Sequence, residues 1–220
     1  MPIQMITAWS FSRWQTYQNC PFKAKCKFID KIPEPPAPAM ERGSTIHKLA
    51  ENFVDGSLKK LPPELKLFDK EFKALKKAKA KVEESWAFTR NWAETSWFGR
   101  DAWCRIKMDV YDIKKKTLIV IDHKTGKPKP DHADQLSLYA LGGLLKFPEV
   151  EEVTPELWYL DHGTKNENPV TYTRDDLEKL KKEWELKVKP MLNDKTFKPK
   201  PNYTCRYCPF SKANGGKCKF

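Results

Sequence analysis

Two aspartates and a lysine mark the part of this sequence that could carry out chemistry. Asp122 and Lys124 stand two positions apart at the end of the apolar run TLIVID, and Asp109 lies in the alternating stretch before it. Residues i and i+2 of a β-strand point to the same face, so Asp122 and Lys124 would project together. Carboxylates bind Mg²⁺ alongside waters and substrate phosphate, and a lysine can orient a water or stabilise developing negative charge. The three residues therefore predict metal-dependent hydrolysis of phosphodiesters.

The Asp-x-Lys tripeptide is a weak signal by itself, because it is common and usually forms a surface ion pair. Its setting strengthens the signal. Asp122 ends a run with the character of a buried strand, and Thr125-Gly126-Lys127 follow as a turn. Asp112 is an alternative to Asp109, although it lies at the end of the predicted strand and could be a turn residue.

Further motifs accompany this segment in a characteristic order. The stretch IVIDHKTGK is followed by Gln135 and Tyr139, and a segment reading Arg-Gly-Ser-Thr-Ile-His, residues 42–47, lies upstream of Asp109. The set, spread over roughly residues 10–220, resembles the RecB-like branch of the PD-(D/E)XK nuclease superfamily. Each motif is weak alone, and the set is specific. The resemblance implies an α/β fold: a restriction-endonuclease-like core in which helices flank a central mixed β-sheet.

The resemblance also implies a role for each matching residue. Asp109 and Asp122 would bind Mg²⁺ or Mn²⁺, together with His47 and the backbone carbonyl of His123, and Lys124 would be the catalytic lysine. The family motif places an aspartate inside an alternating strand, which favours Asp109. A capping or core position is the alternative for His47.

Gln135 and Tyr139 are implied to contact the DNA strand beside the site. Their i, i+4 spacing puts both on one face of a helix. Packing of an amphipathic helix is the alternative, and Tyr139 could be a core residue.

The cysteines form a second constellation. Cys205 and Cys208 make a C-x-x-C pair of the kind that binds metals, and Cys218 follows. Cys20 is the expected fourth ligand, and Cys26 is a possible substitute. The arrangement resembles an iron–sulfur subgroup of the family, which includes the CRISPR-associated RecB-like exonucleases and the AddB nuclease domain. There a 4Fe–4S cluster staples the C-terminal tail to an N-terminal helix. Zn²⁺ is the alternative, because four thiolates suit both.

The overall charge favours a polyanionic partner. The chain has 220 residues, with 41 Lys and Arg against 29 Asp and Glu, a formal net charge of +12. The lysines are dispersed, which suits contact with phosphates better than base reading. No apolar run approaches the roughly 20 residues that a membrane helix needs. No signal peptide is recognised, so we expect a cytoplasmic protein, in a bacterial or phage-infected cell, without disulfides.

The length of the chain predicts one compact domain over residues 1–220. Together with the family resemblance, this implies a mainly helical region over 1–95, a nuclease core over 96–192 and a metal-cluster tail over 193–220. Helices are predicted over residues 10–32 with a break at Cys20-Pro21, 43–56, 67–93, 131–146 and 174–192. Strands are predicted over residues 96–112 and 117–122 as a hairpin, over 153–162, and over 169–173.

These observations favour a metal-dependent DNA exonuclease acting on single strands or on DNA ends. Resemblance to the CRISPR-associated enzymes favours 5′→3′ polarity. The alternatives are a structure-specific DNA endonuclease and a non-catalytic DNA-binding module with a cysteine-ligated cluster. A phage or mobile-element role, with a protein partner in a recombination or DNA-processing complex, follows only by analogy. The sequence does not determine the oligomeric state.

Overall fold

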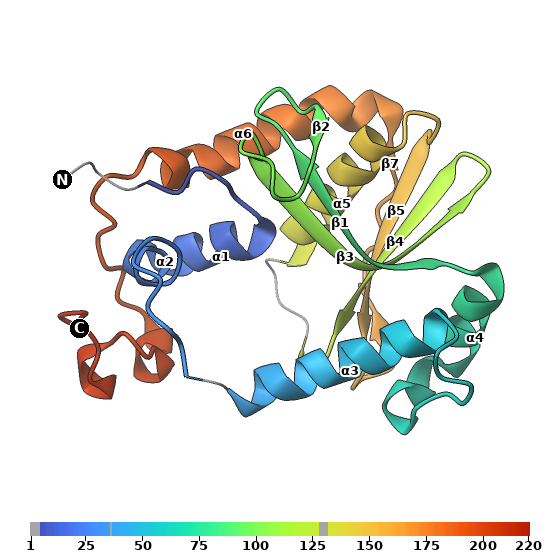
Figure 1. Cartoon of the computed structure of the whole chain (residues 1–220), viewed down its shortest axis with the longest axis horizontal. Coiled ribbons are helices and arrows are strands. Elements are labelled where there is room, and N and C mark those ends of the chain that lie inside the picture. Colours follow the sequence, from blue (N-terminus) through green and yellow to red (C-terminus); the bar gives the residue numbers. More distant parts are fainter. Residues whose placement is uncertain (1–4, 36, 128–131) are drawn as a thin grey trace. The chain divides into compact units, whose positions relative to one another are not determined.

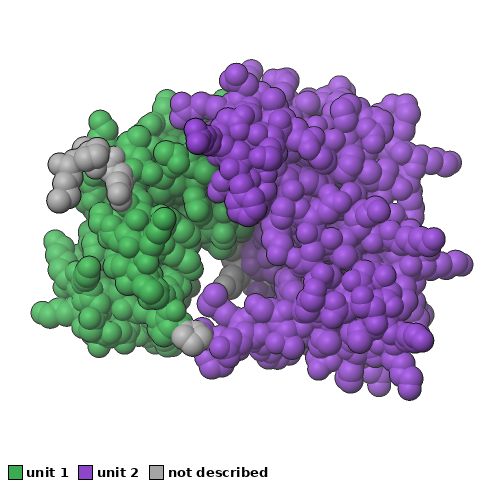
Figure 2. All heavy atoms as spheres, in the orientation of Figure 1, with its two compact units in different colours: residues 1–36, 183–220 green, residues 37–182 purple. Residues whose placement is uncertain are grey.

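The computed structural model describes residues 5–35, 37–127 and 132–220. The chain divides into two compact units, which Figure 2 colours separately. We call residues 37–182 the sheet unit, and residues 1–36 with 183–220 the terminal unit.

The sheet unit is built on seven strands in the order β2-β1-β3-β4-β5-β6, with β7 paired to β5 (Figure 1). Strands β4 and β5 pair in parallel and the other neighbours pair antiparallel, so the sheet is mixed. This confirms the predicted fold class, a central mixed sheet flanked by helices. The strands are β1 (Lys81–Phe88), β2 (Glu94–Thr95), β3 (Cys104–Lys114), β4 (Thr117–Lys124), β5 (Glu152–Tyr159), β6 (Thr164–Lys165) and β7 (Tyr172–Thr173).

Helices cover both faces of this sheet. Helix α3 (Pro38–Val54), the 3₁₀ helix Pro63–Phe68 and helix α4 (Asp69–Ala78) share a buried apolar cluster with β3, β4 and β5. Ile119 of β4 packs against that cluster, whereas its neighbour Leu118 lies against helix α5 (His132–Lys146). Adjacent residues of a strand point to opposite faces, so α5 covers the other side.

Helix α5 approaches the sheet closely. A Cβ added at Gly142 would lie 2.6 Å from Cδ1 of Ile106, and one added at Gly143 would lie 2.4 Å from Cδ2 of Leu118. Residues 135–144 of this helix are all buried. The helix predicted over residues 131–146 is confirmed over the described residues 132–146, and the burial of residues 135–144 leaves that stretch without an exposed face.

The prediction of a helix through residues 67–93 is wrong in its second half. Helix α4 ends at Ala78, and Lys79 adopts a left-handed conformation with φ of 57°. The chain then forms β1, whose last three residues are buried. The lysine-rich sequence favours a helix locally, and burial of Trp86, Ala87 and Phe88 in the sheet overrides that preference. The hairpin of β3 and β4 is confirmed, with Lys114 paired to Thr117, but its first strand begins at Cys104 and not at residue 96.

Tryptophans organise the core of the terminal unit. Trp9 stacks on Trp184 with ring centroids 5.4 Å apart, and the edge of Trp14 meets Trp184 at 5.3 Å. Ser10 caps helix α1 (Phe11–Asn19), its side chain accepting a hydrogen bond from the backbone N–H of Arg13. The break at Cys20-Pro21 is also confirmed, because α2 (Pro21–Ala24) and a π-helical turn (Lys25–Ile29) follow it.

Helix α6 (Leu177–Asn193) begins in the sheet unit and ends in the terminal unit. Thr173 and Asp176 form a capping box at the short 3₁₀ turn before it. In the part of the chain that the structure describes, no helix has the length and apolar character needed to span a bilayer.

Candidate active site

The hairpin of β3 and β4 stops pairing where its two aspartates lie. Its register runs from Lys114 opposite Thr117 to Val110 opposite Ile121. Asp109 and Asp122 are the next positions on the two strands. There the backbone N–H of His123 donates to Oδ2 of Asp109 at 2.6 Å. The Asp109 carboxylate therefore accepts the hydrogen bond of a β4 backbone N–H. Both carboxylates lie where the pairing of the two strands ends.

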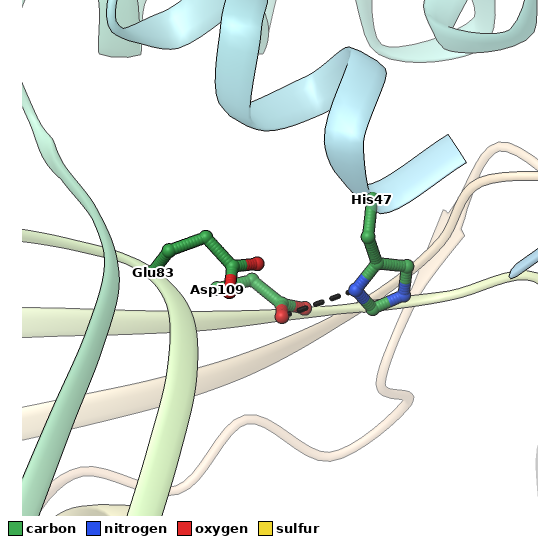
Figure 3. A group of neighbouring side chains, drawn as sticks. All are labelled: His47, Glu83 and Asp109. Atoms are coloured by element: carbon green, nitrogen blue, oxygen red, sulfur yellow. Dashed lines mark hydrogen bonds and ion pairs between the residues drawn. The ribbon is translucent and has the colours of Figure 1, made fainter. Parts of the chain in front are cut away.

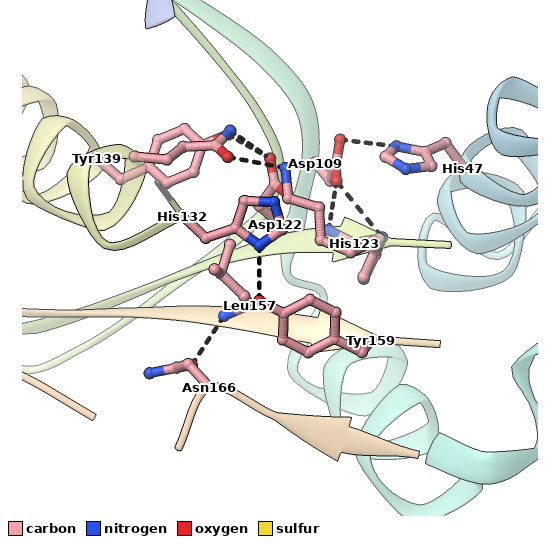
Figure 4. Close-up of polar contacts among 11 residues, drawn as sticks. His47, Asp109, Asp122, His123, His132, Tyr139, Leu157, Tyr159 and Asn166 are labelled. Atoms are coloured by element: carbon pink, nitrogen blue, oxygen red, sulfur yellow. Dashed lines mark hydrogen bonds and ion pairs between the residues drawn. The ribbon is translucent and has the colours of Figure 1, made fainter. Parts of the chain in front are cut away.

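Asp122 is held in a hydrogen-bonded network with helix α5 (Figure 4). Its Oδ1 accepts hydrogen bonds from the hydroxyl of Tyr139 and, at 3.0 Å, from Nε2 of Gln135. Its Oδ2 lies 2.6 Å from Nζ of Lys124, which also donates to Oε1 of Gln135 at 2.8 Å. Asp122 and Lys124 thus project to the same face of β4, as the i, i+2 spacing requires.

Gln135 and Tyr139 are buried side chains whose polar atoms bind Asp122 and Lys124. Burial, followed by the charge of Asp122, raises the pKa of Tyr139 well above its usual value, so the phenol stays protonated and donates. Both residues lie on one helix face, as predicted. Their contacts hold the carboxylate and the lysine, and a contact with DNA remains a prediction.

Asp109 is paired with His47 of helix α3. Nδ1 of His47 lies 3.1 Å from Oδ1 of Asp109. Burial by itself raises the pKa of Asp109, but the hydrogen bond from His47 and the nearby His123 outweigh it, so the net pKa is lowered. Burial likewise lowers the pKa of His47, and Asp109 outweighs it, so the net pKa is raised. The alternative residue, Asp112, instead lies 3.4 Å from Nζ of Lys114.

The His123 side chain extends into the apolar cluster under α3 and α4, with its Nδ1 3.8 Å from Oδ2 of Asp109. Its ring packs against Phe72 at 5.2 Å and Trp158 at 5.9 Å between centroids. Neither ring nitrogen has a hydrogen-bond partner among the described residues. Burial lowers the pKa of His123 to about 4. The ring is therefore neutral at physiological pH, and the residue's predicted role rests on its backbone carbonyl alone.

The structure adds Glu83 of β1 to this group. One ligand atom each of His47, Glu83 and Asp109 lie within 4.8 Å of one another (Figure 3). Two carboxylates and an imidazole are donors that suit Mn²⁺ or Mg²⁺. Glu83 was not among the predicted site residues, because the segment around it was predicted to be helical.

Comparison with known protein families identifies the family to which this chain belongs. A model of the PD-(D/E)XK nuclease superfamily matches residues 8–213. The chain belongs to this superfamily. It is a hydrolytic nuclease, and nucleases of this superfamily use divalent metals. The predicted assignment to the superfamily is confirmed, whereas the RecB-like branch and the iron–sulfur subgroup stay predictions.

Two solved structures are similar to the nuclease over most of its length, and the second of them, with a TM-score above 0.5, supports the fold. SSO0001 is 17% identical to the nuclease, with a TM-score of 0.49, over 94% of this chain and 86% of that one. A protein from Eubacterium rectale named as an exonuclease is 14% identical, with a TM-score of 0.51, over 92% of this chain and 87% of that one. At these identities the likeness concerns the fold alone. No curated protein matches the nuclease sequence.

The Arg42-Gly43 motif positions the helix that carries His47. The guanidinium of Arg42 makes two hydrogen bonds with Asp161, just after β5, at 2.6 and 2.8 Å. A Cβ added at Gly43 would lie 3.4 Å from Oγ1 of Thr125, at the end of β4. The motif therefore lays the start of α3 against the strand ends where the aspartates lie.

The candidate cluster ligands all lie in the terminal unit of the nuclease, and some of them interact with one another. The backbone N–H of Lys200 donates to Sγ of Cys20 at 3.5 Å. Burial raises the pKa of the Cys26 thiol, and Cys208 and Cys218 contribute to the increase. Among the described residues, no three of these sulfurs lie within 4.8 Å of one another. Cys104, the remaining cysteine, is buried in β3.

Proposed function

We propose that the nuclease is a Mg²⁺- or Mn²⁺-dependent DNA exonuclease whose active site consists of Asp109, Asp122 and Lys124. The observation that supports this most is the meeting of the three residues where β3 and β4 part. There Asp122 lies 2.6 Å from Lys124, and Asp109 binds the neighbouring backbone N–H at 2.6 Å.

Asp109, Asp122, His47 and the backbone carbonyl of His123 would hold the divalent cation. When bound, the cation supplies positive charge for the scissile phosphate and for ionisation of a water. Tyr139 and Gln135 fix Oδ1 of Asp122, which leaves its other oxygen beside Lys124.

Lys124 is partly exposed, with 23% of its side chain accessible, so its ammonium can reach a substrate phosphate or an attacking water. The ammonium contacts both Gln135 and Asp122, which limits the motion of the Lys124 side chain before the substrate binds. In this position it orients the water and stabilises negative charge that develops on the phosphate.

The DNA substrate is supported by the net charge of +12 and its dispersed lysines. The preference for single strands or DNA ends, and 5′→3′ polarity, follow from the resemblance to CRISPR-associated RecB-like exonucleases. A protein partner in recombination or DNA processing, and a bacterial or phage-infected cell as the setting, rest on the same resemblance. A non-catalytic binding module is less well supported, since it would need no carboxylate–lysine pair beside phosphate.

Cleavage of matched linear and circular single-stranded DNA tests the exonuclease mode. With Mn²⁺ present, the linear strand should be degraded from an end while the circular strand of the same sequence persists. Equal loss of the circular strand would replace the exonuclease with the endonuclease alternative. Labels placed in turn at the 5′ and 3′ ends give the polarity.

We also propose that Cys20, Cys205, Cys208 and Cys218 bind a 4Fe–4S cluster, with Cys26 as a possible substitute for Cys20 and Zn²⁺ as the alternative metal. All these residues belong to the terminal unit, and backbone N–H groups already donate to Sγ of Cys20 and Cys205. Metal analysis of anaerobically purified Cys20→Ser and Cys26→Ser variants identifies the fourth ligand. The variant whose bound iron is lost shows which of the two cysteines is the fourth ligand. Zinc in place of iron would support the alternative, and no bound metal would overturn the proposal.

A further inference from the structure

Glu83 and Asp109 face each other across two antiparallel strands. The pairs on either side are Val82 with Val110 and Glu84 with Met108, so the register places Glu83 opposite Asp109. Like charges directly opposite in such a pair destabilise a sheet unless positive charge compensates them. Figure 3 shows the Glu83 carboxylate and the His47 ring on either side of Asp109.

Glu83 also interrupts β1 locally. Its φ of 53° lies in the left-handed region, which a glutamate in a strand rarely adopts. The pairing of β1 with β3 resumes on both sides of it without a change of register. The carboxylate nevertheless stays within 4.8 Å of the ligand atoms of His47 and Asp109.

Lys107 supplies the compensating charge in this structure. Its Nζ lies 2.6 Å from Oε2 of Glu83, and 59% of its side chain is exposed, against 23% for Glu83. Lys107 is two residues from Asp109 on the same strand. An exposed ammonium on a flexible stem is a partner that a cation held by fixed ligands can replace.

We propose that Glu83 is a ligand of a divalent cation bound beside His47 and Asp109, and that this cation replaces Lys107 as the partner of Glu83. The proposal rests on the proposed function and extends its ligand set by one carboxylate. The ion would then be bound by three side chains, each from a different element: His47 of α3, Glu83 of β1 and Asp109 of β3. Mg²⁺ and Mn²⁺ both accept such oxygen-rich sets.

A purely structural ion pair makes a different prediction from a metal ligand. If Glu83 and Lys107 only stabilise the sheet together, removing either one breaks the same contact and has the same consequence. If Glu83 is a ligand, removing it weakens cation binding, whereas removing Lys107 takes away a competing positive charge. The two substitutions then change cation affinity in opposite directions.

Mn²⁺ affinity distinguishes a structural ion pair from a metal ligand. It can be measured without DNA, by EPR of the free ion. We expect Glu83→Gln to weaken Mn²⁺ binding about tenfold or more, and Lys107→Met to preserve or strengthen it. Glu84→Gln is the matched control, because it removes one negative charge from the adjacent position and should change affinity less than twofold. Wild-type affinity in Glu83→Gln, or equal weakening in Glu83→Gln and Lys107→Met, would overturn the proposal.

Measuring DNA cleavage by the same proteins distinguishes failure of the Glu83 proposal from failure of the proposed nuclease function. A wild type that cleaves DNA, beside a Glu83→Gln variant with unchanged Mn²⁺ affinity, would remove Glu83 from the site and leave the nuclease intact. Opposite shifts in affinity without any cleavage would establish the ligand and contradict the proposed activity.

Discussion

The hydroxyl of Tyr139 donates a hydrogen bond to Oδ1 of Asp122, and both side chains are buried. Tyr139 stands on α5 and Asp122 at the end of β4, so this bond ties the helix to the carboxylate. For the proposed active site, this bond would make Tyr139 a positioning residue, a role that requires no contact with the substrate.

Tyr139→Phe should lower cleavage at least about tenfold while leaving DNA affinity unchanged, because a hydrogen bond to a charged group contributes about 1.5–3 kcal/mol. The phenyl ring keeps the packing, so the fold should persist. Single-turnover cleavage and fluorescence anisotropy measure the two effects. Tyr203→Phe, at a position 82% exposed, is the control. A fall in DNA affinity with unchanged single-turnover cleavage would favour the DNA-contact role.

His123 should make the nuclease less stable in acid. Its pKa is about 4 in the fold, because burial lowers it from the usual 6.5. Between these values the unfolded chain binds a proton that the folded chain does not, so stability falls as pH falls from 6.5 to 4. The contribution of His123 to this loss is about 3 kcal/mol, and it grows no further below pH 4.

The substitution His123→Phe removes this group while keeping an aromatic ring in the cluster. The free energy of unfolding, measured by urea at pH 4 and pH 7, should differ less in the variant than in the wild type. His162→Gln, in an exposed turn, should behave as the wild type does. An identical pH dependence in His123→Phe and the wild type contradicts a buried neutral imidazole.

The close approach of α5 to the sheet should make Gly142 intolerant of a side chain. Gly142→Ala places a Cβ 2.6 Å from Cδ1 of Ile106. Overpacking of this kind costs about 1–3 kcal/mol, against which alanine gains about 1 kcal/mol in helix propensity. We expect a net loss in stability and slower cleavage, since α5 carries the residues that hold Asp122.

A double variant tests whether this contact is the cause. Ile106→Val removes the atom that the new Cβ would meet. Thermal unfolding should therefore show the double variant Gly142→Ala, Ile106→Val losing less stability than the sum of the two single changes. Simple additivity would mean that the strain lies elsewhere.

Patterning predicted the hairpin and the facing of Asp122 and Lys124, because both depend on alternation within a strand. It also predicted the helix that bears Gln135 and Tyr139. The contacts of those two side chains with Asp122 could not be predicted, because they depend on how closely α5 packs on β4.

Glu83 was missed for a different reason. The residues around it have helix-favouring lysines and glutamates, and only pairing with β3 makes them a strand. Its position opposite Asp109 is set by that register and by a left-handed backbone conformation. Neither has a signature in the local sequence, so a single sequence gives no reason to choose this glutamate.

The central claim is that Lys124, paired with Asp122, carries out metal-dependent cleavage of DNA. The direct measurement is the cleavage rate of end-labelled DNA with Mn²⁺, comparing wild type, Lys124→Ala and Lys115→Ala. Lys115 lies in the exposed turn of the same hairpin and loses the same charge. Lys124→Ala should cleave about 10²- to 10³-fold more slowly than the other two while still binding DNA. Equal cleavage by all three proteins would contradict the account.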